Sequence, residues 1–225
     1  MGRMVTVLLA GTLTIAASAA LAFAQEPRGY IGASVSAFRV DADEVEGVQP
    51  AFGVGGGLTL SRFLDLEMEA AWPSGAFTRS YSGVSVSFAP AGSSFDEIQR
   101  QGVLTRYDKR REVTVHLSAV AVIHRAGGGR FRPGLIAGVA SLRVHDETVF
   151  TTLSLPDGVD PTHPSIPRGV ERSDRNIGGP TIGGQLAIAV SRRVRIVPDV
   201  RFDYASIGDE INNTWRSGVR VYWVF

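Results

Sequence analysis

The chain has 225 residues, of which 44% are hydrophobic and 20% charged, and its formal net charge is +1. This size suits one globular or barrel domain, and the near balance of charge argues against nucleic-acid binding by bulk electrostatics. The sequence contains no cysteine, which excludes a disulfide framework, a thiolate metal site, a cysteine nucleophile and a lipid-modified bacterial N-terminus, and its 26 glycines argue against a helical protein.

The N-terminal segment has the pattern of a secretory signal peptide. Residues 1–24 contain one cation, Arg3, then an apolar run over 5–21, and end in Ala22-Phe23-Ala24, which fits an A-x-A cleavage site. A transmembrane anchor is the alternative, but the run is short and ends in small residues. We expect residues 1–24 to be removed and residues 25–225 to form one domain outside the cytoplasm. No later apolar stretch is long enough for a spanning helix, so the mature chain can span a membrane only as a closed barrel.

Beyond residue 29, apolar residues recur at every second position, which is the period of a β-strand with two different faces. The alternation predicts eight strands and is poorest in the fifth. They lie near residues 31–37, 52–60, 64–70, 113–123, 131–144, 181–190, 196–204 and 219–225.

The connections between these strands alternate in length. Three are tight turns, at 61–63, 125–130 and 191–193. Four are predicted as long polar loops, at 39–50, 73–111, 145–177 and 206–214, with a short helix at 95–100 in the second. An up-and-down barrel has this pattern when all tight turns lie at one rim and all long loops at the other.

The two strand faces differ sharply, because one carries the charges and the other is aliphatic or aromatic. A soluble ligand-binding barrel would place the charges outside, whereas a membrane barrel places them in its lumen. Periodicity alone does not separate the two. The leader, the asymmetry of the connections and the aromatic residues at strand ends favour the membrane barrel; these aromatic residues are Trp72, Trp215, Trp223 and Phe225.

At its C-terminus the chain has apolar residues at alternate positions and ends in an aromatic residue; these residues are Val219, Val221, Trp223 and Phe225. A glycine-rich strand, 52–57, precedes a tight turn and an alternating acidic strand. In these features residues 25–225 resemble the eight-stranded outer-membrane β-barrel family, the small barrels similar to the transmembrane domain of outer membrane protein A. The resemblance implies an all-β, antiparallel, up-and-down transmembrane barrel. It also implies that the C-terminal residues are an assembly signal, and that the barrel-assembly machinery inserts the chain into a bacterial outer membrane. We expect no peptidoglycan-binding module after Phe225.

The charged face predicts a polar, salt-bridged lumen. We expect Glu67 and Glu69 to pair with Arg201 and Arg220 near mid-depth, since an unpaired charge there is costly. Eight strands leave an interior just wide enough for side chains, which favours a structural plug, and a narrow path for ions or solutes is the alternative. The predicted lumen charges are Asp65, Glu67, Glu69, Asp199, Arg201, Asp203, Arg216 and Arg220.

His116 and Ser118 lie two residues apart and therefore on one face of a strand. Outer-membrane lipid deacylases use a strand His and Ser two apart, and such a pair could hydrolyse an ester. The alternation, however, directs both side chains into the lumen rather than toward lipid, and the sequence shows no obvious acid partner. We expect them to form hydrogen bonds in the lumen.

Three further motifs are expected to be unrelated to catalysis. The run 53–57 superficially resembles a dinucleotide-binding loop, but Leu58 replaces the third glycine and a strand follows. The acidic first loop is expected to be solvated, with loose binding of calcium or divalent-bridged lipopolysaccharide as the alternative; its acids are Asp41, Asp43, Glu44 and Glu46. A basic cluster could contact lipid phosphates at the outer rim; it comprises Arg106, Lys109, Arg110 and Arg111.

The sequence thus predicts a non-enzymatic, porin-like β-barrel of the bacterial outer membrane, with a structural and surface-interaction role in envelope integrity, adhesion or recognition. The alternatives are a narrow channel for ions or small solutes, a lipid-modifying esterase and a soluble secreted ligand-binding barrel. We expect no cofactor, no metal and no nucleic-acid partner. The expected partners are outer-membrane lipids, lipopolysaccharide and the barrel-assembly machinery, and the barrel is expected to be a monomer.

Overall fold

The computed structural model describes residues 28–42, 45–90, 92–125, 129–207 and 210–225. The predicted signal peptide, residues 1–24, lies outside this range. In chain order, the elements are β1 (Arg28–Ala42), β2 (Val45–Thr59), β3 (Leu64–Pro73), β4 (Ala76–Ser87), α2 (Phe95–Arg100), β5 (Gly102–His124), β6 (Phe131–Ser154), β7 (Gly169–Ala189), β8 (Val194–Ile207) and β9 (Glu210–Val224). No helix in the described ranges has the length and apolarity needed to cross a membrane.

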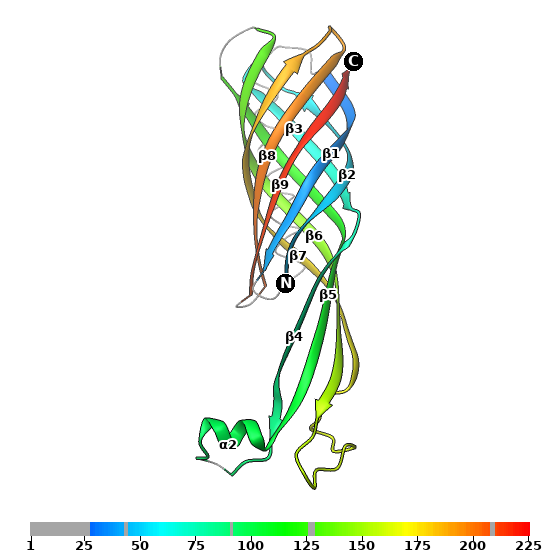
Figure 1. Cartoon of the computed structure of the whole chain (residues 1–225). Coiled ribbons are helices and arrows are strands. Elements are labelled where there is room, and N and C mark those ends of the chain that lie inside the picture. The colour runs from blue at the N-terminus through cyan, green and yellow to red at the C-terminus, as the bar shows by residue number, and fades with distance from the viewer. Residues whose placement is uncertain (1–27, 43–44, 91, 126–128, 208–209) are drawn as a thin grey trace.

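Eight of the strands close into one antiparallel barrel (Figure 1). The barrel order is β3-β2-β1-β9-β8-β7-β6-β5, and pairing of β3 with β5 closes the ring. The eight predicted strands match parts of these eight, to within one residue at their ends. The fifth predicted strand lies in β6, which pairs with β5 from His124↔Gly134 onward. The predicted eight-stranded antiparallel barrel is therefore confirmed.

The β2–β3 and β7–β8 connections are tight turns. The amide of Leu60 donates to the carbonyl of Leu64 at 2.9 Å, and the amide of Val190 donates to the carbonyl of Val194 at 3.0 Å. These turns lie at the same end of the barrel as the C-terminus (Figure 1). We call this the turn end and the opposite end the loop end.

The long-loop prediction is wrong in extent. β1 continues to Ala42 and β2 starts at Val45, while β8 continues to Ile207 and β9 starts at Glu210, so most of 39–50 and 206–214 is strand. The second expected loop contains the additional strand β4, and the third is partly the ends of β6 and β7. These segments remain in the sheet because backbone hydrogen bonds between strands do not require a buried face.

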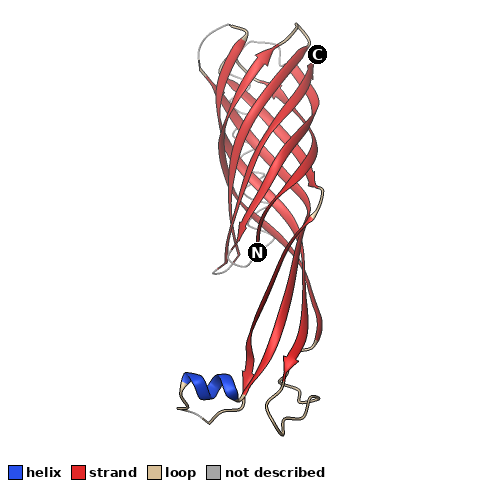
Figure 2. Cartoon of the chain, viewed as in Figure 1, coloured by secondary structure: helices blue, strands red, loops and turns tan. Residues whose placement is uncertain are grey.

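Parts of β4, β5, β6 and β7 form a sheet that continues from the barrel wall well beyond its loop end (Figure 2). It arises where β5 exchanges partners: His116 to Ile123 pair with β3, whereas Gly102 to Glu112 pair with β4. We call this the protruding sheet; it comprises residues 76–87, 102–112, 145–154 and 169–175.

Cross-strand aromatic contacts support the protruding sheet. The rings of Tyr81 and Tyr107 are stacked at 4.9 Å between centroids, and Phe150 meets Tyr107 edge-on at 5.5 Å. Near the tip, α2 occupies the predicted range 95–100, and the Ser94 side chain caps it by accepting a hydrogen bond from the Glu97 amide. Such cross-strand side-chain pairs stabilise a sheet.

Candidate functional site: the barrel lumen

The structure places all eight predicted lumen charges inside the barrel. They come from three strands: β3 contributes Asp65, Glu67 and Glu69, β8 contributes Asp199, Arg201 and Asp203, and β9 contributes Arg216 and Arg220. All are buried, and the most exposed, Asp199, is 8% exposed. They are inward because successive side chains of a strand point to opposite faces.

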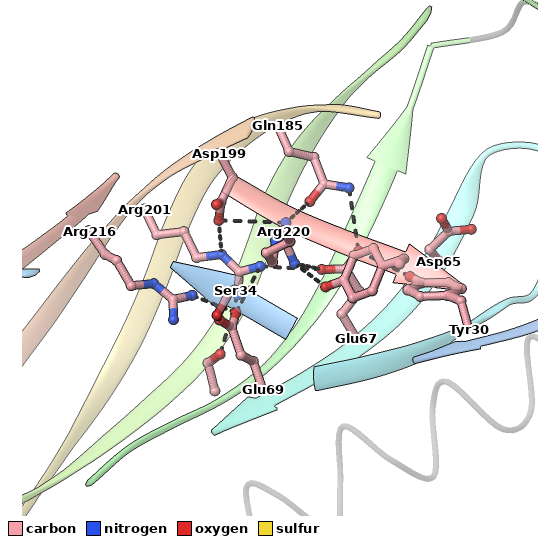
Figure 3. Close-up of polar contacts among 12 residues, drawn as sticks. Tyr30, Ser34, Asp65, Glu67, Glu69, Gln185, Asp199, Arg201, Arg216 and Arg220 are labelled. Atoms are coloured by element: carbon pink, nitrogen blue, oxygen red, sulfur yellow. Dashed lines mark hydrogen bonds and ion pairs between the residues drawn. The ribbon is translucent and has the colours of Figure 1, made fainter. Parts of the chain in front are cut away.

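Glu67 is the centre of the lumen network (Figure 3). Its carboxylate accepts hydrogen bonds from Arg220 and from Nη2 of Arg201, the latter at 3.3 Å. The Tyr30 hydroxyl donates to it at 3.0 Å, and Nε2 of Gln185 donates at 3.4 Å. Donors from four other strands, β1, β7, β8 and β9, therefore meet at this one buried carboxylate of β3.

Glu69 and Asp199 extend the network to both sides. Glu69 accepts hydrogen bonds from Ser34 Oγ at 2.7 Å and from Nη2 of Arg216 at 2.8 Å, and Nη2 of Arg201 lies 3.6 Å from it. Asp199 accepts from Nε of Arg201 at 2.7 Å. The structure thus brings the two glutamates to Arg201, as expected, and adds Arg216 as the close partner of Glu69.

The glycine-rich β2 makes room for these side chains. Gly53 and Gly55 face the lumen, where an added Cβ would lie 2.4 Å from Ser34 Oγ and 3.2 Å from the Glu69 Cβ and Cγ, respectively. These glycines therefore accommodate the network, in line with their interpretation as strand residues with small side chains.

Each of two lumen histidines contacts a carboxylate. Nε2 of His116 lies 2.9 Å from Asp203, which also accepts from Thr214 Oγ1 at 3.0 Å. Nε2 of His124 lies 2.9 Å from Asp65. His116 thus has the acid partner that the sequence did not reveal, because Asp203 is 87 positions away on β8.

His116 and Ser118 do not form a nucleophile–base pair in this arrangement. His116 is engaged by Asp203, and Ser118 accepts a hydrogen bond from Nη1 of Arg201 at 3.2 Å. Both side chains are buried inside the barrel, away from its outward-facing surface. The geometry favours the expected hydrogen bonding in the lumen over ester hydrolysis.

Apolar layers lie on both sides of the charged layer, which the sequence analysis missed. Toward the loop end, a buried cluster consists of Phe38, Val40, Ala51, Phe77, Val113, Leu142, Val144 and Ile177. Toward the turn end, another consists of Tyr30, Ala187, Val197, Tyr222 and Val224. The rings of Phe38 and His116 meet at 5.6 Å between centroids, so the apolar and charged layers are in contact. The lumen is thereby packed above and below its charges.

The opposite face of the strands is apolar and exposed. The C-terminal residues Val219, Val221 and Trp223 are 46–50% exposed, and Phe225 is 74% exposed. Trp72 and Trp215 are also exposed, near the loop ends of their strands. This is the outward apolar surface with aromatic residues at both ends that a membrane barrel has.

The basic cluster of the second connection lies within the protruding sheet, where its side chains contact acidic and aromatic side chains of the same sheet. Arg106 donates to Asp108 at 3.0 Å, Nη2 of Arg110 lies 3.5 Å from Glu112, and the Lys109 ammonium lies 5.5 Å from the centroid of the Tyr81 ring. The contact of this cluster with lipid phosphates stays a hypothesis. The side chains of the acidic first loop, 41–46, lie outside the described residues, so its cation binding stays a prediction.

Arg111, the fourth basic residue, is held at the base of the protruding sheet. Its Nε donates to Asp146 at 2.6 Å, and Arg175 donates to the same carboxylate. Burial alone would raise the pKa of Asp146, but these two guanidinium groups outweigh it and lower the pKa below its ordinary value. The base of the sheet therefore contains a charged carboxylate between two cations.

No protein-family model matches this chain, and no curated protein matches it in sequence. Its fold is similar to the solved structure of Neisserial surface protein A, with a TM-score of 0.52 and 11% sequence identity over 89% of this chain and 100% of that chain. The N-terminal β-barrel domain of Pseudomonas aeruginosa OprF gives a TM-score of 0.43 and 12% identity over 89% and 100% of the two chains. With its closed ring of eight antiparallel strands, the chain has the fold of the small outer-membrane β-barrel proteins.

Proposed function

We propose that this chain is a non-enzymatic protein of the bacterial outer membrane that uses its protruding sheet for surface recognition or adhesion. The barrel would be inserted by the barrel-assembly machinery, with its loop end outside the cell. The apolar outward wall and the aromatic residues near both ends of the strands support this location.

The observation that carries the recognition role is the protruding sheet with its open edge. Within the described part of the chain, β4 pairs with β5 on one side and with no strand on the other, beyond the point where β3 leaves β5. An edge strand offers unpaired backbone groups to an extended segment of a partner. The tip adds exposed apolar side chains, including Phe95 at 72% and Leu153 at 50% exposure.

The lumen supports a structural role rather than a channel. Its charged layer is paired, and apolar clusters lie on both sides of it. A conducting path needs hydrated space along its length, whereas an eight-stranded barrel is filled by its own side chains. The same burial of His116 and Ser118 argues against a lipid-modifying esterase.

Location and recognition require separate tests. Cell fractionation with heat-modifiable gel mobility tests the barrel: we expect the protein in the outer membrane, with a mobility shift on boiling. A protein found in soluble fractions would contradict the location and favour a soluble barrel.

Adhesion is tested by replacing residues 79–108 and 148–172 with short turns, which removes most of the protruding sheet and leaves the barrel. We expect cells with this variant to lose surface attachment while its outer-membrane level stays normal. Shortening only the tip loop, 155–168, is the matched control, because it preserves the β4 edge. Attachment that is unchanged without the sheet would contradict the recognition role.

A further inference from the structure

The lipid-facing wall carries a shallow groove across β1, β9, β8 and β7. It consists of two adjoining depressions that share Val200 and Ser217, with volumes of about 340 and 560 Å³. The first is also lined by Arg39 and Trp215, and the second by Gly184 and Pro198. Because the two depressions share Val200 and Ser217, we treat them as one continuous groove in the outer wall.

Small outward side chains explain the groove. Gly184 and Ser217 occupy positions where most of the outer wall carries bulky aliphatic residues, such as Ile182 at 59% exposure. The β7–β8 ladder also has a gap among the described residues, between the pairs Gln185↔Asp199 and Ile188↔Ile196. Pro198 lies in this gap and has no N–H to donate to the ladder.

The position of the groove along the barrel axis, relative to the bilayer, follows from the two tryptophans of β9. Trp215 and Trp223 are both exposed and eight residues apart, which is roughly 27 Å along a strand and about 20 Å along the axis of a tilted barrel. This is close to the apolar band of about 25 Å that outer-membrane barrels have. Trp215 therefore marks the interface at the loop end, and the groove runs from there toward the middle of the wall.

Arg39 lies at this interface, directly opposite Trp215 in the β1–β9 register, and is exposed. A guanidinium at headgroup depth is suited to a phosphate, because it binds phosphate oxygens through two parallel hydrogen bonds. Below it, the groove offers apolar contacts from Val200 and Val219. A cation above an apolar groove complements an anionic head attached to an acyl chain.

We propose that this groove binds one acyl chain of a phosphate-bearing lipid of the outer leaflet, with Arg39 contacting the lipid phosphate. The inference rests on the proposed outer-membrane location, since only there does this wall meet such lipids. It gives the barrel wall a specific lipid-binding site in addition to its general contact with the bilayer.

Different substitutions can test the acyl-chain groove and the phosphate contact independently. A Cβ at Gly184 would have only the Gly134 carbonyl oxygen within 4 Å, at 3.8 Å, so Gly184→Leu fills the groove without a backbone clash. Arg39→Ala removes the cation, and Arg39→Lys retains the charge. Arg143→Ala is the matched control, because Arg143 is exposed on β6 and does not line the groove.

The test is native mass spectrometry of the purified full-length protein with diphosphorylated lipid A and with the same lipid after removal of its phosphates. We expect the parent protein and Arg143→Ala to retain one phosphorylated lipid. Gly184→Leu should lower retention of both lipids at least fivefold. Arg39→Ala should abolish the preference for the phosphorylated lipid, and Arg39→Lys should restore part of it.

Fractionation and heat-modifiable mobility are measured on the same proteins. A folded, outer-membrane parent protein that retains no lipid overturns the lipid site and leaves the proposed function standing. The site is also overturned if Gly184→Leu or Arg39→Ala behaves like Arg143→Ala. A parent protein absent from the outer membrane overturns both proposals.

Discussion

Replacing Glu69 by Ala is expected to destabilise the barrel strongly. The Glu69 carboxylate accepts hydrogen bonds from Ser34 and Arg216, and the Glu69 and Arg216 side chains are each 2% exposed. The substitution leaves the Arg216 guanidinium buried without this carboxylate. Breaking one partner of a buried ion pair costs about 3–5 kcal/mol, less if water enters.

The assay is denaturant unfolding of the purified barrel in detergent micelles or liposomes, followed by gel mobility. Met68→Ala is the matched control, because Met68 is the neighbouring residue on β3 and is 63% exposed on the outer face of the barrel. In a double-mutant cycle, Arg216→Met combined with Glu69→Ala should recover part of the loss, since residues in one network are coupled by about 0.5–3 kcal/mol.

Conductance separates a packed lumen from a pore. In a planar bilayer, we expect no steady current from the parent protein. If Glu69→Ala is as stable as the parent protein and changes a single-channel current, the lumen charges are hydrated and the packed-lumen interpretation is refuted.

Three further predictions concern assembly, topology and pH. Removing Phe225, or changing Trp223 and Phe225 to Asp, should abolish insertion, because their apolar side chains lie on the outer face of the barrel and the terminal residues resemble an assembly signal. Normal outer-membrane levels of the truncated protein would contradict this. An epitope in the tip loop, 155–168, should be labelled on intact cells, whereas one in the turn 61–63 should be labelled only after the outer membrane is opened; the reverse labelling would invert the topology. The pKa of Asp146 is lower in the folded sheet than the ordinary value of about 3.9, so its carboxylate stabilises the protruding sheet above that pH, and the stabilisation is lost as the pH falls through the lowered folded value. Hydrogen exchange of the protruding sheet, corrected for intrinsic rates, should show this loss of stability in the parent protein but not in Asp146→Asn. If the variant showed the same pH dependence as the parent protein, the stabilisation could not be assigned to Asp146.

The barrel strands could be predicted from the sequence because two different environments act on alternate residues. In β3, acidic residues at every second position face the lumen and the residues between them face outward, so periodicity identified both strand and faces. The same argument explains why β4 was missed. Apart from Phe77, its residues are exposed or half-buried and show no regular alternation of buried and exposed positions.

The partners of the lumen charges could not be predicted in full, because alternation gives the face of a residue but not its neighbours across the barrel. Glu67 and Arg220 are 153 positions apart, and their contact depends on strand tilt and ring closure. The pairing of His116 with Asp203 was missed for this reason. Phe38 and Phe77 were missed as lumen residues because the segments around them were interpreted as loop and loop edge.

The layers of the lumen explain why its charges must be paired so closely. Phe38 and Phe77 pack in the cluster on the loop side of the charged layer, and Tyr30 and Tyr222 pack in the cluster on the turn side. This packing restricts water around the charges, so their attraction is strong and any unpaired group is costly. The two proposed interactions with other molecules lie instead on the outer surfaces, at the protruding sheet and along the wall beside Arg39.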